Sequence, residues 1–217
     1  MISGSFFCFL VMSRCPKQIR RTLMQRDDVL CRAALFPRFI KDGVFDIETL
    51  MRFSTVEEDS HYAMSVGSKF LLRTSDGVHN YGCAAAQIAN DNFREKNGRD
   101  PEPLNEAVHY LGFYELPFHS IKDVRGRLTN HHLSVRWVPE HGQDAHFQVE
   151  LWKTVPAGAR QLRRDRVAAR GFLSAYLTGF PERHVCNSDR SIASILNALE
   201  LPTLPKIEAS AAEARGA

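Results

Sequence analysis

The amino-acid sequence predicts an α+β fold, in which a small antiparallel sheet of three to five strands carries helices packed on one face. Two segments decide this prediction. Residues 132–152 have the apolar spacing of a β-hairpin, and residues 158–178 have that of an amphipathic helix. The hairpin is expected at the centre of the sheet. With 217 residues and no internal repeat, the chain is expected to form one globular domain.

The hairpin prediction rests on the alternation of apolar and polar side chains on both sides of a polar turn. The apolar positions are Leu133, Val135, Trp137, Phe147, Val149 and Leu151. A shift of one residue would turn all of them to water, so burial fixes the register and pairs Trp137 with Phe147. The same register places Arg136 opposite Gln148.

Two helices and a strand are expected in residues 27–73. Residues 27–39 carry apolar side chains at helical spacing. Asp46 is suited to cap a second, short helix that turns Leu50 and Phe53 inward. Residues 66–73 resemble a buried strand, which a turn follows.

The segment after this strand allows two interpretations. Residues 79–83 either return as a second strand, or Asn80 caps a helix that covers residues 83–96. Alanines favour the helix from residue 83 onward, and Asn97 followed by glycine is a typical helix end.

Four more elements are predicted. Aspartate followed by proline opens a helix over residues 101–111, and residues 113–124 are expected in a strand. The helix over residues 158–178 is the clearest in the chain, because its apolar and arginine side chains separate onto two sides. A last helix begins at Ser188 or Asp189 and ends before two prolines.

The globular domain is expected to cover residues 24–204. Residues 1–23 are interpreted as a leader that is either disordered or precedes the true start codon. Residues 205–217 are interpreted as a disordered tail. The apolar run inside the leader is too short to cross a bilayer, which needs about 20 residues. The candidates for the first residue are Met1, Met12 and Met24.

Charge and cysteine content favour an ordinary soluble protein of the cytoplasm. The net charge of +3 is too small to require a polyanionic partner. The five cysteines form no CxxC pair and are odd in number, which is typical of reduced thiols. They are Cys8, Cys15, Cys31, Cys83 and Cys186.

The chemical motifs of common enzymes are absent from the sequence. It contains no glycine-rich phosphate loop, no GxSxG and no HExxH, so no nucleotide cofactor is expected. The neighbouring His131 and His132 point to opposite faces of the predicted strand. His146 shares a face with His132 but lies roughly 20 Å away along the hairpin. We therefore expect no metal ion.

A thiol hydrolase is one alternative function. If Asn80 caps the helix, Cys83 lies in its first turn, where backbone amides lower a thiol pKa. The segment Tyr-Gly-Cys-Ala around Cys83, followed by a strand that opens with His132, resembles the order found in papain-like hydrolases, including the NlpC/P60 type. That resemblance implies a Cys83 nucleophile and a His132 base, and Gln148 or His146 on the next strand is the candidate for the group that orients the imidazole.

Nucleic-acid binding is the second alternative. The basic side of the predicted helix 158–178 is suited to phosphate contacts, because arginine forks match phosphate geometry. Its residues are Arg160, Arg163, Arg164 and Arg170. The leading expectation is a cytoplasmic accessory or binding protein without catalytic activity, for which a protein partner is suitable.

Overall fold

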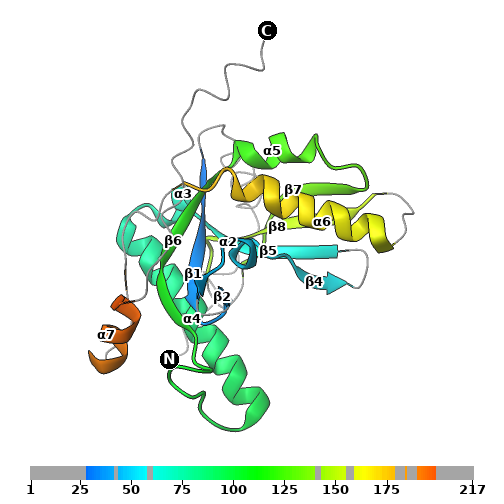
Figure 1. Ribbon diagram of the computed structural model, residues 1–217. Helices are drawn as coiled ribbons and strands as arrows, with labels where there is room; N and C mark the ends of the chain where they lie inside the picture. Colours follow the sequence, from blue (N-terminus) through cyan, green and yellow to red (C-terminus); the bar gives the residue numbers. More distant parts are fainter. Residues whose placement is uncertain are drawn as a thin grey trace, which may run out of the picture.

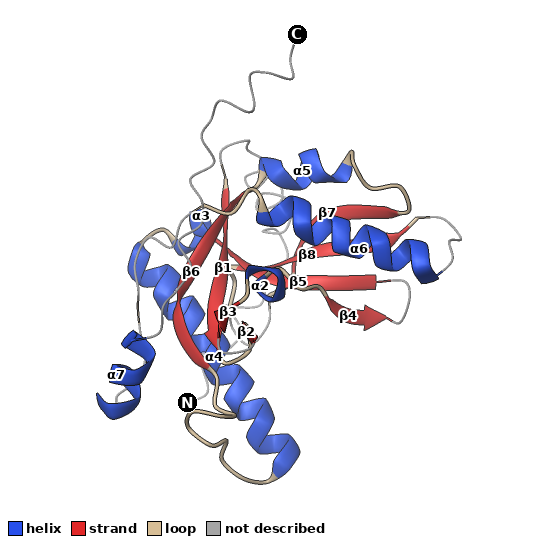
Figure 2. Ribbon diagram, viewed as in Figure 1, coloured by secondary structure: helices blue, strands red, loops and turns tan. Residues whose placement is uncertain are grey.

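The computed structural model describes residues 28–41, 44–57, 61–139, 143–154, 159–178, 184 and 190–198. In these residues a six-stranded antiparallel sheet packs against helices (Figures 1 and 2). The α+β class is confirmed, and the sheet is larger than predicted. No helix in the described part is both long and apolar enough to cross a membrane. The predicted leader and tail lie outside these residues.

The sheet runs in the order β6 (His109–Pro117), β1 (Val29–Phe36), β5 (His61–Ser68), β8 (His146–Lys153) and β7 (His131–Trp137). A short sixth strand, β4 (Ser54–Glu57), pairs with β5. A separate two-stranded ribbon consists of β2 (Ile40–Lys41) and β3 (Val44–Phe45). Every strand is antiparallel to its neighbours.

The predicted hairpin is confirmed together with its register. Strands β7 and β8 pair Trp137 with Phe147 and Arg136 with Gln148. Leu133 is fully buried on its apolar face. The position of the hairpin differs from the prediction, because β7 forms one edge of the sheet and only β8 lies inside it.

Six helices accompany the strands in the described residues. They are α2 (Ile47–Leu50), α3 (Lys69–Leu72), α4 (Ser75–Asn97), α5 (His119–Arg125), α6 (Ala159–Ser174) and α7 (Arg190–Ala198). The Asp46 side chain caps α2 as predicted, by accepting a hydrogen bond from the Glu48 amide at 3.0 Å. Helices α6 and α7 correspond to the two predicted C-terminal helices.

Helices α4 and α6 cover opposite faces of the sheet. The guanidinium of Arg166 on α6 lies 4.5 Å from the ring centre of Tyr62 on β5. Five residues further along β5, a Cβ on Gly67 would lie 2.9 Å from the ring of Tyr81 on α4. Strand residues an odd number apart point to opposite faces. The expectation that all helices pack on one face is therefore wrong; Figure 1 shows α5 and α6 together across one side.

Two helix predictions are wrong, and the predicted strand over residues 113–124 is right only for its first half. Residues 27–39 contain β1 instead of a helix, and residues 101–111 contain a loop and the start of β6. Residues 113–124 contain the end of β6 and most of α5. Strands β1 and β6 are buried on both faces, so they lack the alternation that identifies a half-buried strand.

The helix at residue 83 begins earlier than predicted. Thr74 caps α4 and residue 75 opens it, so Asn80 lies inside the helix and does not cap it. Likewise, residues 66–73 combine the end of β5 with α3, and Phe70 is exposed. The predicted end is confirmed, because Gly98 adopts the left-handed conformation that closes α4.

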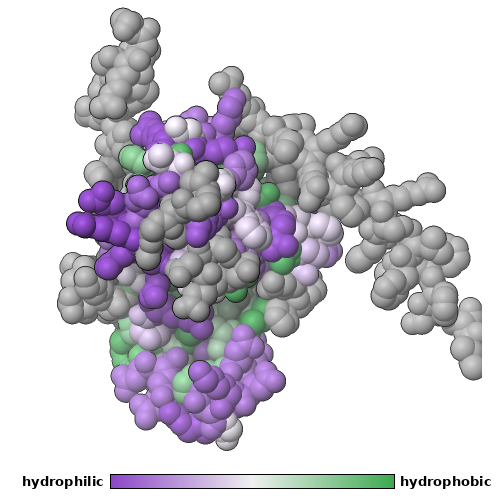
Figure 3. All heavy atoms as spheres, turned by 90° about the vertical axis from the view of Figure 1, so that its right-hand side faces the viewer, coloured by the Kyte–Doolittle hydropathy of each residue, from purple (hydrophilic) through white to green (hydrophobic). Residues whose placement is uncertain are grey.

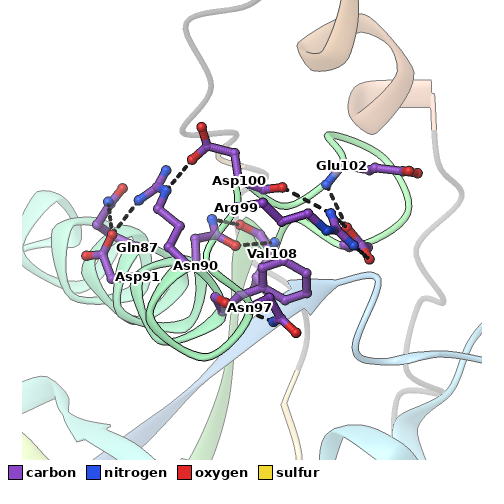
Figure 4. Close-up of polar contacts among 11 residues, drawn as sticks. Gln87, Asn90, Asp91, Asn97, Arg99, Asp100, Glu102 and Val108 are labelled. Atoms are coloured by element: carbon purple, nitrogen blue, oxygen red, sulfur yellow. Dashed lines mark hydrogen bonds and ion pairs between the residues drawn. The ribbon is translucent and has the colours of Figure 1, made fainter.

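Side-chain hydrogen bonds fix the C-terminal half of α4 against the start of β6 (Figure 4). The Asn90 amide donates to the Val108 carbonyl at 3.0 Å and accepts from the Val108 amide at 2.7 Å. Arg99 pairs with Glu106 through two hydrogen bonds of 2.6 Å. Hydrophilic side chains cover this end of the molecule, at the bottom of Figure 3.

Candidate anion-binding site

The edge of β5 carries a gap between two partner strands. Strand β1 pairs with Gly67 and Ser68, and β4 pairs with residues 61–63 of the same edge. Residues 64–66 therefore have no strand partner on that side within the described residues. Unpaired backbone groups in a sheet need another partner, because burying them alone costs free energy.

Arg32 of β1 occupies this gap. Its Nη1 donates to the Ser65 carbonyl at 2.6 Å, and its Nε donates to the Leu50 carbonyl at 2.9 Å. The guanidinium also lies 5.2 Å from the ring centre of Phe39. Carbonyl dipoles and an aromatic ring thus hold the cation in place, and no carboxylate contributes to these contacts.

A cavity of about 880 Å³ opens around Arg32. Ala63, Met64 and Ser65 of β5 all line it, although consecutive strand residues point to opposite faces. Helix α4 contributes Tyr81 on one face, and α6 contributes Arg166 on the other. Residues from both faces of the sheet therefore line the cavity, and its volume is in the range of small-molecule sites.

Six arginines line this cavity, whereas none of its described lining residues is an aspartate or glutamate. They are Arg32, Arg38, Arg52, Arg163, Arg166 and Arg170. Arg170 is partly neutralised by Glu48 at 2.9 Å, and Arg166 packs on Tyr62. For Arg38, Arg52 and Arg163 no ion pair occurs within the part of the chain that the structure describes.

Burial and like charge destabilise the cations at the gap. Burial lowers the pKa of Arg32 to about 10, the Tyr81 hydroxyl opposes this decrease, and the charge of Arg38 adds to it. Burial also lowers the pKa of Arg38. Arg32 still carries its proton at neutral pH, because its pKa remains well above 7. Two neighbouring guanidinium groups therefore repel each other in a space that is suited to an anion.

The structure separates the residues of the predicted thiol site. Cys83 lies in the third turn of α4, away from the amides that lower a thiol pKa at a helix start. It is disulfide-bonded, so it has no free thiol in this form, and the expectation of a reduced thiol is wrong for Cys83. The remaining described cysteine, Cys31, is buried, and burial raises its pKa to about 12.

His132 lies apart from Gln148 and from α4. His132 pairs with Trp152 and Gln148 with Arg136, so four residue steps, about 13 Å, separate them along the hairpin. Helix α4 packs on β6 and β1, and β1 is three strand spacings, roughly 14 Å, from β7. His132 is exposed, and Gln148 lines the arginine cavity.

The predicted basic helix face divides into two sets. Arg163 and Arg170 line the cavity, whereas Arg160 and Arg164 are exposed and outside its lining. Sequence reasoning missed Arg166, although its spacing from Arg163 and Arg170 places all three on one side of a helix. It also missed Arg32, Arg38 and Arg52, which come from separate segments and carry no shared sequence signal.

No group of three or more metal-ligating side chains occurs within the residues that the structure describes. His131 is instead bound to Asp165 of α6, whose carboxylate lies 3.1 Å from Nδ1 and also accepts the Asn130 amide at 2.7 Å. This contact attaches α6 to β7 beside the arginine cavity. Searches of protein families, curated proteins and solved structures find no match to this chain.

Proposed function

We propose that this protein is a binding protein for a small anionic molecule with phosphate-like groups, which it holds in the arginine-lined cavity. The observation that carries the proposal is the concentration of arginines around Arg32 with no carboxylate among the described lining residues. Arginine forks bind phosphate oxygens in pairs, and such charge-assisted hydrogen bonds are strong. An anion would also relieve the repulsion between Arg32 and Arg38.

The shape of the site favours a small ligand over a nucleic-acid duplex. Arg166 and Arg170 are partly buried in the cavity, and Arg32 lies in the gap of the sheet itself. A protein that reads a duplex inserts an exposed helix or strand into a groove. Arg160, Arg163 and Arg164 are the exposed arginines of α6 and would have to supply most of the contacts to such a partner.

Inorganic pyrophosphate is a suitable first probe, measured by titration calorimetry at low ionic strength. We expect the double variant Arg52→Gln/Arg163→Gln to weaken binding by about tenfold or more, because it removes two charged donors. Neither residue has an ion pair in the described part of the chain, so the fold loses little.

Arg160→Gln/Arg164→Gln is the matched control, because it removes the same charge from α6 outside the cavity. We expect this variant to bind pyrophosphate within about twofold of the parent, since exposed charges at that distance are screened. The proposal fails if the parent protein binds no pyrophosphate, or if the control loses as much affinity as the cavity variant.

A further inference from the structure

A second, smaller cavity continues the first on the α4 side of the sheet. It has a volume of about 500 Å³ and shares Arg38 and Asn92 with the arginine-lined cavity. Phe93 and Lys96 of α4 extend it toward the C-terminal end of that helix. The two cavities are therefore neighbours that share part of their lining.

The cations along this site lie at two separate ends. Arg163 and Arg166 belong to α6, on one face of the sheet. Arg38 and Lys96 lie beside α4, on the opposite face. Arg32 stands between them, in the gap of the sheet. The cations are thus distributed along the site instead of surrounding one point.

The carboxylate of Glu106, near the α4 end of the site, is already paired with an arginine. Glu106 lines the smaller cavity, but both of its oxygens bind Arg99 at 2.6 Å. That contact, together with the Glu102 amide, lowers the pKa of Glu106 to about 2. Arg38 and Lys96 consequently remain open to an external anion.

Apolar side chains line the middle of the site. Phe39 lies under the Arg32 guanidinium, and Phe53 and Met64 are further lining residues. A site of this length with apolar walls is larger than one phosphate group requires. Its middle is therefore suited to the carbon skeleton of an organic molecule.

We infer that the ligand is an elongated organic molecule with an anionic group at each end, which extends from one cavity into the other along the Arg32 side chain. One group binds Arg163 and Arg166 on the α6 side, and the other binds Arg38 and Lys96 on the α4 side. This inference rests on the proposed function and specifies its ligand class, an organic bisphosphate or a similar double anion.

The test compares hexyl phosphate with bisphosphates of straight-chain diols, from butanediol to decanediol, by calorimetry on the full chain. Two linked anions bind as one event once the linker matches the span of the sites. We expect one length in the series to bind about tenfold more tightly than hexyl phosphate, and shorter members to lose that gain. Equal affinity across the whole series overturns the inference.

The variant Lys96→Gln separates the two ends, because Lys96 lines the smaller cavity and is absent from the lining of the arginine cavity. It should remove most of the advantage of the best bisphosphate and leave the affinity for hexyl phosphate within about twofold, because every cation of the arginine cavity is intact. Loss of both affinities to the same degree contradicts the two-ended site. If neither pyrophosphate nor hexyl phosphate binds the parent, the proposed function fails; if they bind and no bisphosphate binds better, only the double-anion inference fails.

Discussion

Charged side chains are withdrawn from water at two places in the sheet, and the two places differ in how the charge is balanced. Glu150 of β8 is 2% exposed and accepts hydrogen bonds from Arg136 at 2.7 Å and from the Trp152 indole at 3.0 Å. Within the described residues, the polar and aromatic contacts of the Arg32 guanidinium on β1 are with two carbonyl oxygens and the Phe39 ring. The Glu150 cluster is complete without a ligand, whereas the arginine cavity has unbalanced positive charge.

A further contact supports the structural role of the Glu150 cluster. His61 Nε2 lies 3.2 Å from a Glu150 oxygen, although the angle is outside hydrogen-bond geometry. The His61 and Trp152 rings stack at a centroid distance of 3.6 Å. The cluster therefore joins β5, β7 and β8, and buried charge of this kind contributes to stability rather than to binding.

The largest expected effect comes from breaking the balanced cluster. Glu150→Ala should lower the free energy of unfolding by about 2 kcal/mol, because it leaves the Arg136 and Trp152 donors without their acceptor. Urea denaturation measures this change. Glu115→Ala is the comparison, since it removes a surface pair with Lys69 and should cost at most about 1 kcal/mol. Equal losses of unfolding free energy in the two variants would show that the buried Glu150 cluster is no more stabilising than a surface ion pair.

A smaller effect is expected from filling the unbalanced cavity. Pyrophosphate at ten times its dissociation constant should stabilise the folded protein by about 1.4 kcal/mol, through binding to the native state alone. Thermal denaturation with and without the anion measures this gain. Glu150→Ala should retain the gain, because its cluster does not line the cavity. A gain that depends on Glu150 would mean that the two sites are coupled.

The smallest effect concerns the repulsion between Arg32 and Arg38. Without a ligand, Arg38→Gln should raise the free energy of unfolding by a few tenths of a kcal/mol at low ionic strength, because it removes a like charge near Arg32. Salt screens this repulsion, so the gain should disappear at high ionic strength. Urea denaturation at two salt concentrations tests both statements. If Arg38→Gln instead lowers the free energy of unfolding at low salt, the charge of Arg38 is already neutralised by another group.

The sequence was sufficient for the parts of the fold that depend on near neighbours. The β7–β8 register follows from alternation within one segment, and Asp46 caps α2 through contacts within three residues. The β1–β6 pair joins segments about eighty residues apart and is buried on both faces. Local spacing therefore mistook β1 and the first residues of β6 for helices, because such strands show no period of two.

The candidate site depended on the same distant pairings. Arg163 and Arg170 were predicted as a basic set because they share one helix. Arg32 joins them only through the gap between β1 and β4, which exists because both strands pair with one edge of β5. No pattern in the sequence specifies that gap, so the cavity appears only once the sheet is assembled.

Residues of both α4 and α6 line the arginine cavity, although the sheet lies between the two helices. A bound molecule would therefore contact both helices and the sheet at once. Binding would stabilise all three layers, including residues that do not touch the ligand. Backbone amides of both helices would then exchange their hydrogens with solvent more slowly, even where they lie far from the bound molecule.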